Sequence, residues 1–271
     1  MNIQLIAFDL DGTLLNSRGQ ILTSSKKVIK KAIDQGIKVV LVTGRHHTAT
    51  YPYHHELDLD TPIVACNGTY LYDTKTNTMP IGNPLSVEQA EQVICLAEEY
   101  QLDLLMYSRY AMNYIRLNDH MKNFSTWVAG CPDEVKPNLR QCSDFRQLLK
   151  DEQEVIWKFV ISHPNKDYMQ KAIDQLPISD FSCEWSWVDR VDVARQDNSK
   201  GSRLLELLKN WNIDPQNVIA FGDNQNDISM LSAVGMGVAM GNAELEVKAK
   251  TKFSTKSNDN DGIAEFLNHY L

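Results

Sequence analysis

The stretch that most limits the possible fold covers residues 37–43, which read IKVVLVT and are almost continuously apolar. Such a run is hydrophobic on both faces, as is typical of a central strand in a parallel sheet that helices cover on both sides. A helix pattern over residues 23–35 comes just before it, and a strand pattern over residues 3–8 comes before that helix. Residues 62–68 add another short strand. This alternation predicts a doubly wound α/β domain.

The composition of the sequence and its pattern of predicted elements then change twice. From about residue 84 the chain is richer in aromatic residues and methionine and has long polar connectors. Near residue 190 the early pattern returns, with a leucine-rich helix and a strand that ends in Gly-Asp. We therefore expect residues 1–83 and 190–271 to build one α/β core, and residues 84–189 to form an inserted α+β domain.

Composition and charge exclude several classes of protein. The 271 residues are 43% hydrophobic and 23% charged, which predicts a packed core, and the net charge of -8 disfavours a general nucleic-acid role. The five cysteines are dispersed without a CxxC pair, as is typical of reduced thiols in a cytosolic protein. No signal-like start and no apolar run of membrane length is visible. We expect a cytoplasmic monomer or small homo-oligomer that does not enter a membrane.

Two acids, Asp9 and Asp11, follow the first predicted strand in the stretch LIAFDLDGTLL. In an extended chain these two side chains point to the same side and lie roughly 6.5 Å apart along the strand. Ligands of open parallel sheets bind at the carboxyl ends of the strands, where Asp9 falls. A hard cation there would take oxygen ligands and offset the repulsion of the carboxylates. The alternative is a solvated DxDG turn.

Two further pieces could hold an anion. Thr43 and Gly44 end the central strand, and a hydroxyl and backbone N–H groups at such a turn can hold a phosphate, although Thr-Gly also simply ends strands. Lys200, in NSKG, lies at the start of a predicted helix. A lysine is unfavourable at the positive end of a helix, so its placement indicates a nearby anion unless it is a solvated surface residue.

The last piece is GDNQND, in which Asp223 ends another core strand and Asn226 and Asp227 open the next helix. One of these residues could serve only as a helix N-cap. All four pieces lie at the end of a core strand or the start of a core helix. Because such positions meet at one edge of a parallel sheet, we expect a single site.

DLDGT, TGR, the lysine of NSKG and GDNQND, in this order, resemble the four motifs of haloacid dehalogenase (HAD) superfamily phosphatases. The insertion resembles the large, C2-type cap of the Cof branch. The resemblance implies a Rossmann-like catalytic core with a cap that determines substrate specificity. It also implies a Mg²⁺-dependent phosphoric monoester hydrolase.

The roles of the HAD motifs carry over by position. Asp9 would be the nucleophile that forms an aspartyl-phosphate, and also a Mg²⁺ ligand. Asp11 would donate a proton to the leaving oxygen, take one from water, and bind the metal through its backbone carbonyl. Asp223 would be another metal ligand, supported by Asp227. The phosphoryl oxygens would be held by the Leu10 amide, Thr43, Gly44 and Lys200, with Asn226 touching the phosphate or the surroundings of the metal.

The presence of Asp11 favours phosphoryl hydrolysis. By resemblance, dehalogenases of this superfamily lack the second Asp, and its transporting ATPases carry Thr there together with membrane spans. A positioned acid and base is typically worth roughly 10² to 10⁴ in rate. The transition state of phosphoryl transfer is stabilised mainly by positioning and electrostatics, which Mg²⁺ and Lys200 would supply.

The substrate is indicated by a closer resemblance. VTGRHH, CNGTYLYD, CEWSW and FGDNQNDISML resemble bacterial pyridoxal phosphate phosphatases of the Cof branch. This implies hydrolysis of pyridoxal 5'-phosphate to pyridoxal, with sugar phosphates as further substrates. Strand alternation would place Trp185 and Trp187 on one face, where they could bind a planar ring or pack in a core. Arg45 and His46 could contact substrate or lie at a solvated helix start.

Three other functions remain open from the sequence. The same core could belong to a sugar phosphatase acting on hexose phosphates or to a phosphosugar transferase. A non-catalytic protein that binds a phosphorylated metabolite is the third alternative.

Overall fold

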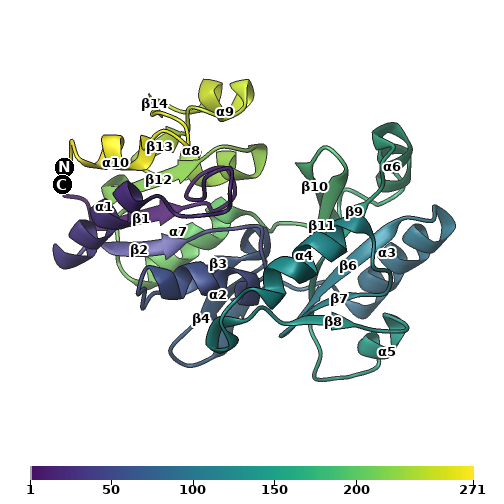
Figure 1. Ribbon diagram of the computed structural model, residues 1–271. Helices are drawn as coiled ribbons and strands as arrows, with labels where there is room; N and C mark the ends of the chain where they lie inside the picture. The colour runs from purple at the N-terminus through teal and green to yellow at the C-terminus, as the bar shows by residue number, and fades with distance from the viewer. Residues whose placement is uncertain (1) are drawn as a thin grey trace. The chain divides into compact units, whose positions relative to one another are not determined.

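The computed structural model describes residues 2–271, with the side chains of all of these except residue 120. The chain divides into two compact units, drawn in Figure 1. Unit 1 contains Met1–Arg45, Tyr53–Pro80 and Ser199–Leu271, and unit 2 contains His46–Pro52 and Ile81–Asn198. The second division lies after Asn198 and not at residue 190, because β11 (Arg190–Arg195) pairs with strands of unit 2.

The main sheet of unit 1 has five parallel strands in the order β14-β13-β12-β1-β2. The central strand β1 (Leu5–Phe8) has all four residues buried, as expected for a strand covered on both faces. Leu5 lies opposite Lys38 of one neighbour and Val218 of the other. The other strands are β2 (Lys38–Leu41), β12 (Val218–Gly222), β13 (Met236–Ala239) and β14 (Phe253–Ser254).

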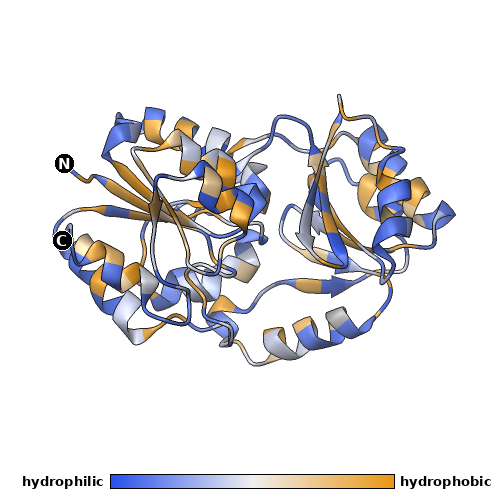
Figure 2. Cartoon of the chain, turned by 90° about the horizontal axis from the view of Figure 1, so that it is seen from above, coloured by the Kyte–Doolittle hydropathy of each residue, from blue (hydrophilic) through white to orange (hydrophobic). Residues whose placement is uncertain are grey.

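Helices cover both faces of this sheet, as Figure 2 shows. Helix α1 (Thr23–Asp34) packs against α10 (Gly262–Leu267), and α7 (Lys200–Asn210) packs against α8 (Ile228–Ala233). The connection from β1 through α1 to β2 and the connection from β12 through α8 to β13 run in opposite directions across the sheet. Because both crossovers are right-handed, α1 and α8 lie on opposite faces. The predicted doubly wound α/β core is confirmed. Helix α9 (Leu245–Lys250) also belongs to unit 1, whereas α2 (His47–Glu56) begins in unit 2 and ends in unit 1.

A small three-stranded sheet extends unit 1 beyond β2. Its strands are β3 (Ile63–Ala65), β4 (Tyr70–Asp73) and β5 (Thr78–Gly82), and Val64 forms a parallel bridge to Val42. Between β3 and β4 lies the short 3-10 turn η1 (Cys66–Gly68). Two more such turns follow in unit 1, η3 (Pro215–Asn217) and η4 (Gln225–Asp227). The β3 strand and η1 lie beside the end of β2, where the predicted site begins.

Unit 2 is built on a six-stranded sheet in the order β10-β11-β9-β6-β7-β8, antiparallel except between β7 and β8. Its core joins apolar side chains of α3 and α6 to the sheet, among them Ile94, Met169, Phe159 and Val193. Figure 2 shows these apolar segments facing one another. This unit is the α+β insertion that the sequence predicts. Its remaining strands and helices are β10 (Phe181–Trp187), β9 (Ile156–Ser162), β6 (Asp103–Ser108), β7 (Met112–Tyr114), β8 (Leu139–Gln141), α3 (Val87–Glu99), α4 (Asp119–Ala129), η2 (Asp133–Val135), α5 (Arg146–Leu149) and α6 (Lys166–Ile173).

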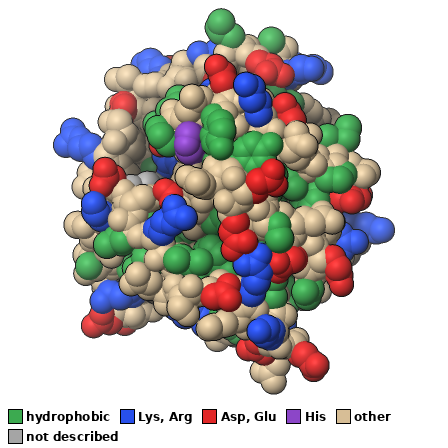
Figure 3. Space-filling view, turned by 90° about the vertical axis from the view of Figure 1, so that its right-hand side faces the viewer, with side chains coloured by type: hydrophobic (Ala, Val, Ile, Leu, Met, Phe, Trp, Pro, Cys, Tyr) green, Lys and Arg blue, Asp and Glu red, His purple; other side chains and the backbone are tan. Residues whose placement is uncertain are grey.

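The surface of the molecule in Figure 3 carries acidic and basic side chains interspersed with hydrophobic ones. Among the described residues, no helix is long and apolar enough to cross a membrane.

Candidate active site

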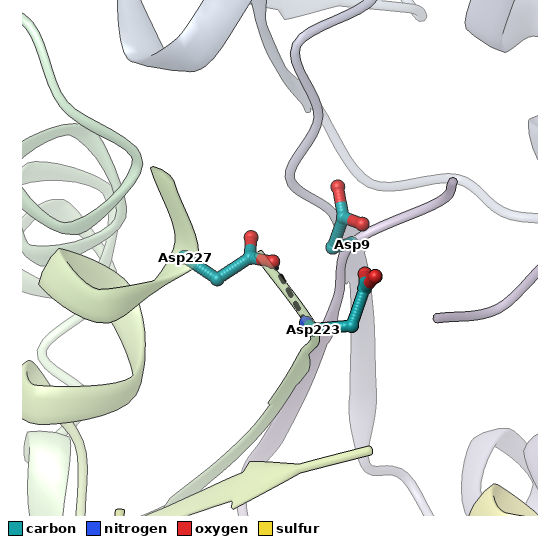
Figure 4. Close-up of side chains that lie close together, drawn as sticks. All are labelled: Asp9, Asp223 and Asp227. Atoms are coloured by element: carbon teal, nitrogen blue, oxygen red, sulfur yellow. Dashed lines mark hydrogen bonds between the residues drawn. The ribbon is translucent and has the colours of Figure 1, made fainter. Parts of the chain in front are cut away.

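Three carboxylates converge at the carboxyl edge of the parallel sheet of unit 1. Asp9 follows β1 and Asp223 follows β12, and the two ends are joined by a hydrogen bond from the Asp9 amide to the Phe221 carbonyl (3.1 Å). Asp227 comes from η4, just after β12. One oxygen of each carboxylate lies within 4.8 Å of the others. Figure 4 shows the carboxylates of Asp9 and Asp223 directed into the same space, as the shared strand ends predict.

The buried ammonium group of Lys200 joins two of these acids. Its Nζ lies 2.6 Å from Asp9 Oδ1 and 2.6 Å from Asp227 Oδ1. The side chain of Lys200 is 1% exposed, so this contact is sheltered from water. The anion that the lysine at this helix start predicts is therefore a pair of carboxylates of the protein itself. Their charges raise the pKa of Lys200 above its usual value although burial opposes the charged form.

Asp227 makes its hydrogen bonds within the protein. Its Oδ2 accepts from the amides of Asp223 (2.9 Å) and Asn224 (3.1 Å), and its Oδ1 accepts from Lys200. A Cβ atom at Gly222 would lie 2.5 Å from the Cβ of Asp227, so this packing requires glycine there. Both oxygens of Asp227 are engaged, which fits a residue that orients Asp223 and Lys200.

Burial and mutual repulsion oppose ionisation of the other two acids. Burial raises the pKa of Asp9 well above its ordinary value, the charge of Asp227 adds to this, and Lys200 opposes it. Burial and Asp227 also raise the pKa of Asp223, to about 7, although Thr13 Oγ1 donates a hydrogen bond of 2.8 Å to its Oδ1. Asp9 and Asp227 are buried and share the Lys200 ammonium group, whereas Asp223 is half-buried and accepts from Thr13. A divalent cation would supply the missing positive charge.

The donor set fits such a cation. Carboxylate oxygens are the ligands that Mg²⁺ prefers, and those of Asp9 and Asp223 face one space in Figure 4. Asp223 also packs directly against the turn after β1, because a Cβ at Gly12 would lie 2.2 Å from Asp223 Oδ2. Gly12 has a φ of +81°, a left-handed conformation that glycine adopts readily. The glycine of DLDGT thus brings the Asp223 carboxylate and the Asp11 backbone close together.

The Asp11 side chain lies outside this buried cluster. Its carboxylate is 61% exposed and is bound in a two-pronged ion pair by Arg45, with Nε at 2.7 Å and Nη2 at 2.6 Å. The Arg45 guanidinium also lies over the ring of Tyr53, 5.2 Å from its centroid. The structure therefore pairs Arg45, which the sequence makes a candidate for substrate contact, with the predicted acid and base of the reaction.

The remaining predicted phosphoryl contacts lie along the same edge of unit 1. Leu10 follows Asp9 and is buried, and Thr43 and Gly44 follow β2, the neighbour of β1. The Thr43 hydroxyl oxygen accepts a hydrogen bond from the Arg45 amide (3.1 Å). Asn226 lies in η4 and its Nδ2 donates to Asn67 Oδ1 (3.1 Å). Asn67 is absent from the predicted site, although the Asn-Gly pair directly after a strand was a visible turn signal.

The candidate specificity residues are placed differently. His46, in unit 2, is fully buried, and its Nε2 lies 2.9 Å from the Ser108 carbonyl. Burial lowers the pKa of His46 to about 3. A bulge in β10 between Trp185 and Trp187 interrupts the alternation that would have put both rings on one face. Trp185 donates to Gln170 of α6 (3.2 Å), whereas Trp187 is 62% exposed.

Comparisons with known proteins agree with the motifs. Residues 6–267 match the sequence family described as haloacid dehalogenase-like hydrolase. The chain is 40% identical to pyridoxal phosphate phosphatase YbhA of Escherichia coli, over 100% of both chains. It is 30% identical to 5-amino-6-(5-phospho-D-ribitylamino)uracil phosphatase YwtE of Bacillus subtilis, over 99% of this chain and 98% of that one. A haloacid dehalogenase-like hydrolase of Bacteroides thetaiotaomicron superposes with a TM-score of 0.86 at 27% identity, covering 99% of this chain and 100% of the other.

Proposed function

This chain belongs to the haloacid dehalogenase-like hydrolases and is a phosphoric monoester hydrolase, and we propose that it hydrolyses pyridoxal 5'-phosphate through an aspartyl-phosphate on Asp9. The observation that carries the mechanism is the buried carboxylate of Asp9, held by Lys200 and facing Asp223. The substrate is supported by the 40% identity, over the full chain, to a relative named for that activity. We also assign the choice of substrate to unit 2, the inserted α+β unit.

Asp9 is the nucleophile. One of its carboxylate oxygens forms a bond to phosphorus while the bond from phosphorus to the ester oxygen breaks. Lys200 favours the ionised form of Asp9 against the effect of burial, and it fixes the orientation of this carboxylate through a 2.6 Å contact. Asp227 holds Lys200 from the other side, so the ammonium group is positioned between the two acids.

Asp11 transfers the protons. Asp11 must first take up a proton and give up its ion pair with Arg45; it then donates this proton to the ester oxygen as that oxygen leaves, which releases pyridoxal. It then takes a proton from the water that attacks phosphorus, and the bond between phosphorus and the Asp9 oxygen breaks to release phosphate. Arg45, bound to Asp11 by two contacts, sets where this carboxylate lies before substrate arrives.

The carboxylates of Asp9 and Asp223 and the backbone carbonyl of Asp11 would hold Mg²⁺. When bound, the ion neutralises negative charge on the phosphoryl group. The Thr13 hydroxyl and the Asp227 carboxylate orient Asp223 for this task, through its side chain and its backbone amide respectively.

The phosphoryl oxygens would be held by backbone and side-chain donors of the turns after β1 and β2. These are the Leu10 amide, the Thr43 hydroxyl and the Gly44 amide, together with the Lys200 ammonium. Preorganised donors of this kind supply most of the stabilisation in phosphoryl transfer, because little covalent chemistry is left for the protein to do.

A kinetic comparison tests the substrate. Phosphate release is measured with Mg²⁺ for pyridoxal 5'-phosphate, a hexose phosphate and 5-amino-6-(5-phospho-D-ribitylamino)uracil. We expect the highest kcat/KM for pyridoxal 5'-phosphate. A hexose phosphate that is better by about a hundredfold, or roughly 2.7 kcal/mol in transition-state stabilisation, would replace it as the substrate.

Two substitutions test the mechanism. Asp9→Asn should abolish phosphate release and phosphoenzyme formation. Asp11→Asn should leave binding of Mg²⁺ largely intact but slow both the departure of the leaving group and the attack of water. Turnover that survives in Asp9→Asn would exclude Asp9 as the nucleophile. Ligand binding by the wild-type protein without phosphate release at saturating Mg²⁺ would favour a binding protein.

A further inference from the structure

The turn η1 at the end of β3 has an unusual backbone. Cys66, Asn67 and Gly68 have φ angles of +52°, +57° and +86°, so three successive residues are left-handed. Two of them carry side chains, which makes this conformation costly. Such conformations persist where the surrounding structure enforces them, and they concentrate at functional sites.

The surroundings of η1 do enforce it. The amides of Asn67 and Cys66 donate to the carbonyls of Thr43 (3.0 Å) and Arg45 (2.9 Å), which binds the turn to the segment after β2. A Cβ at Gly68 would lie 2.1 Å from the Ser199 carbonyl oxygen, so the turn also packs directly against the start of α7.

A buried arginine completes this support. Arg203 of α7 donates from Nε to the Gly68 carbonyl (2.9 Å) and from Nη2 to the Thr69 carbonyl (3.5 Å). These contacts fix η1 between Thr43 and the N-terminal turn of α7, which carries Lys200. Both neighbours belong to the proposed phosphoryl site.

The side chain of Asn67 also connects η1 to Asn226 of η4. It is 6% exposed, and its Oδ1 accepts the Nδ2–H of Asn226 at 3.1 Å. The Oδ1 of Asn226 is buried and has no hydrogen-bond partner among the described side chains and backbone. A buried acceptor without a donor is unfavourable, so this oxygen is suited to a donor that arrives with the reactants.

We propose that Asn67 is a positioning residue of the phosphatase site, whose side chain fixes the Asn226 amide so that the Asn226 oxygen faces the reacting groups as a hydrogen-bond acceptor. The group it accepts from is a water or hydroxyl in the phosphoryl site. The left-handed backbone of η1 is what brings the Asn67 side chain to Asn226. The proposal rests on the proposed phosphatase function but not on pyridoxal 5'-phosphate as the substrate.

A double-mutant cycle tests this inference. Asn67→Gly removes the side chain but keeps a residue that adopts a left-handed backbone readily. We expect kcat to fall about 10- to 100-fold with little change in KM, as for the loss of a group that orients a reacting residue. Asn226→Ala should have a similar effect. The double variant should be no slower than Asn226→Ala, because Asn67 acts through Asn226.

The assay uses p-nitrophenyl phosphate as well as pyridoxal 5'-phosphate, with Mg²⁺ and the full chain. Asn212→Gly is the matched control, since Asn212 is also left-handed (φ +53°) but exposed in the turn after α7, and it should keep wild-type kcat. The melting temperature of each variant is measured to separate positioning from folding.

The outcomes are distinct. An unchanged kcat in Asn67→Gly, or additive losses in the double variant, would overturn the positioning role. A fall in kcat that is matched by a large fall in melting temperature would mean that Asn67 serves only the fold. If the wild-type protein releases phosphate from neither compound, the proposed function fails instead, before Asn67 is tested.

Discussion

Replacing Lys200 by methionine should destabilise unit 1 strongly, because the ammonium group is buried between two carboxylates. Lys200→Met keeps the length of the side chain but removes its charge. Each contact of 2.6 Å corresponds to an attraction of about 6 kcal/mol at an effective dielectric constant of 20, before the cost of desolvation is subtracted. Removing one partner of a buried ion pair typically costs about 3–5 kcal/mol, because the other charge stays buried and unpaired. We expect a loss in that range.

The free energy of unfolding is measured by urea denaturation at neutral pH with a chelator present, so that no cation replaces the lysine. Lys209→Met, an exposed lysine of the same helix, is the matched control and should change stability by less than about 0.5 kcal/mol. Adding Asp9→Asn to Lys200→Met should recover about 2 kcal/mol, since it removes one of the two unpaired carboxylates.

Two results would refute this reasoning. A loss below about 1 kcal/mol in Lys200→Met would mean that the pair is solvated in the manner of a surface ion pair. A double variant less stable than Lys200→Met would mean that the repulsion between Asp9 and Asp227 is not what the lysine relieves.

Three further perturbations address the glycine turn, the buried histidine and the cation. Gly12→Ala places a Cβ 2.2 Å from Asp223 Oδ2, so it should lower kcat about 100-fold or more and raise the Mg²⁺ concentration needed for activity. The control is Gly19→Ala, which should keep wild-type kinetics because Gly19 is also left-handed (φ +71°) but has nothing within 4 Å of the added Cβ. Burial lowers the pKa of His46 to about 3, with Lys158 adding to this, so its contribution to stability is fully present above pH 6.5 and is lost as the pH falls toward 3. His46 should therefore contribute a loss of about 1.6 kcal/mol between pH 6.5 and 5, and because burial also lowers the pKa of His47 and His54, urea titrations of the wild type and His46→Gln are compared. An equal slope in His46→Gln would assign the loss to other groups. Mg²⁺ at a hundredfold excess over its dissociation constant should stabilise the wild type by about 2.7 kcal/mol in a thermal shift assay, and a full shift in Asp223→Asn would remove Asp223 from the ligands.

The core could be predicted from the sequence because its strands are apolar on both faces. The buried strand at Leu5–Phe8 lies between two parallel neighbours, as such a run predicts. The run over residues 37–43 predicts a central strand too, but it forms β2, the last strand of the five-stranded sheet, which a bridge from Val42 to Val64 connects to β3. Asp9 and Asp223 follow from the same rule, since the carboxyl ends of adjacent parallel strands meet at one edge. Lys200 was visible as an unfavourable charge at a helix start, and the structure supplies its two partners.

Other features of the structure could not be predicted, because they depend on tertiary contacts that produce no periodic pattern in the sequence. The bulge between Trp185 and Trp187 requires a register shift against β11 that no spacing in CEWSW reveals. The pairing of Arg45 with Asp11 joins side chains 34 positions apart. The link between Asn67 and Asn226 spans 159 positions and depends on a left-handed turn whose geometry the Asn-Gly pair only suggests.

The pairing of β1 with β12 has a consequence for how the protein is made. Leu5 lies opposite Val218, so more than two hundred residues must be synthesised after β1 before it can pair with β12. Residues 81–198, by contrast, contain every strand of the six-stranded sheet and can form it while translation continues. Closing so long a loop is slow, and Lys200 and Asp223 leave the ribosome only after unit 2 is complete. A nascent chain that ends within unit 2 therefore holds Asp9 and Thr43 with no site to complete, and enzymatic activity begins only with the last quarter of the chain.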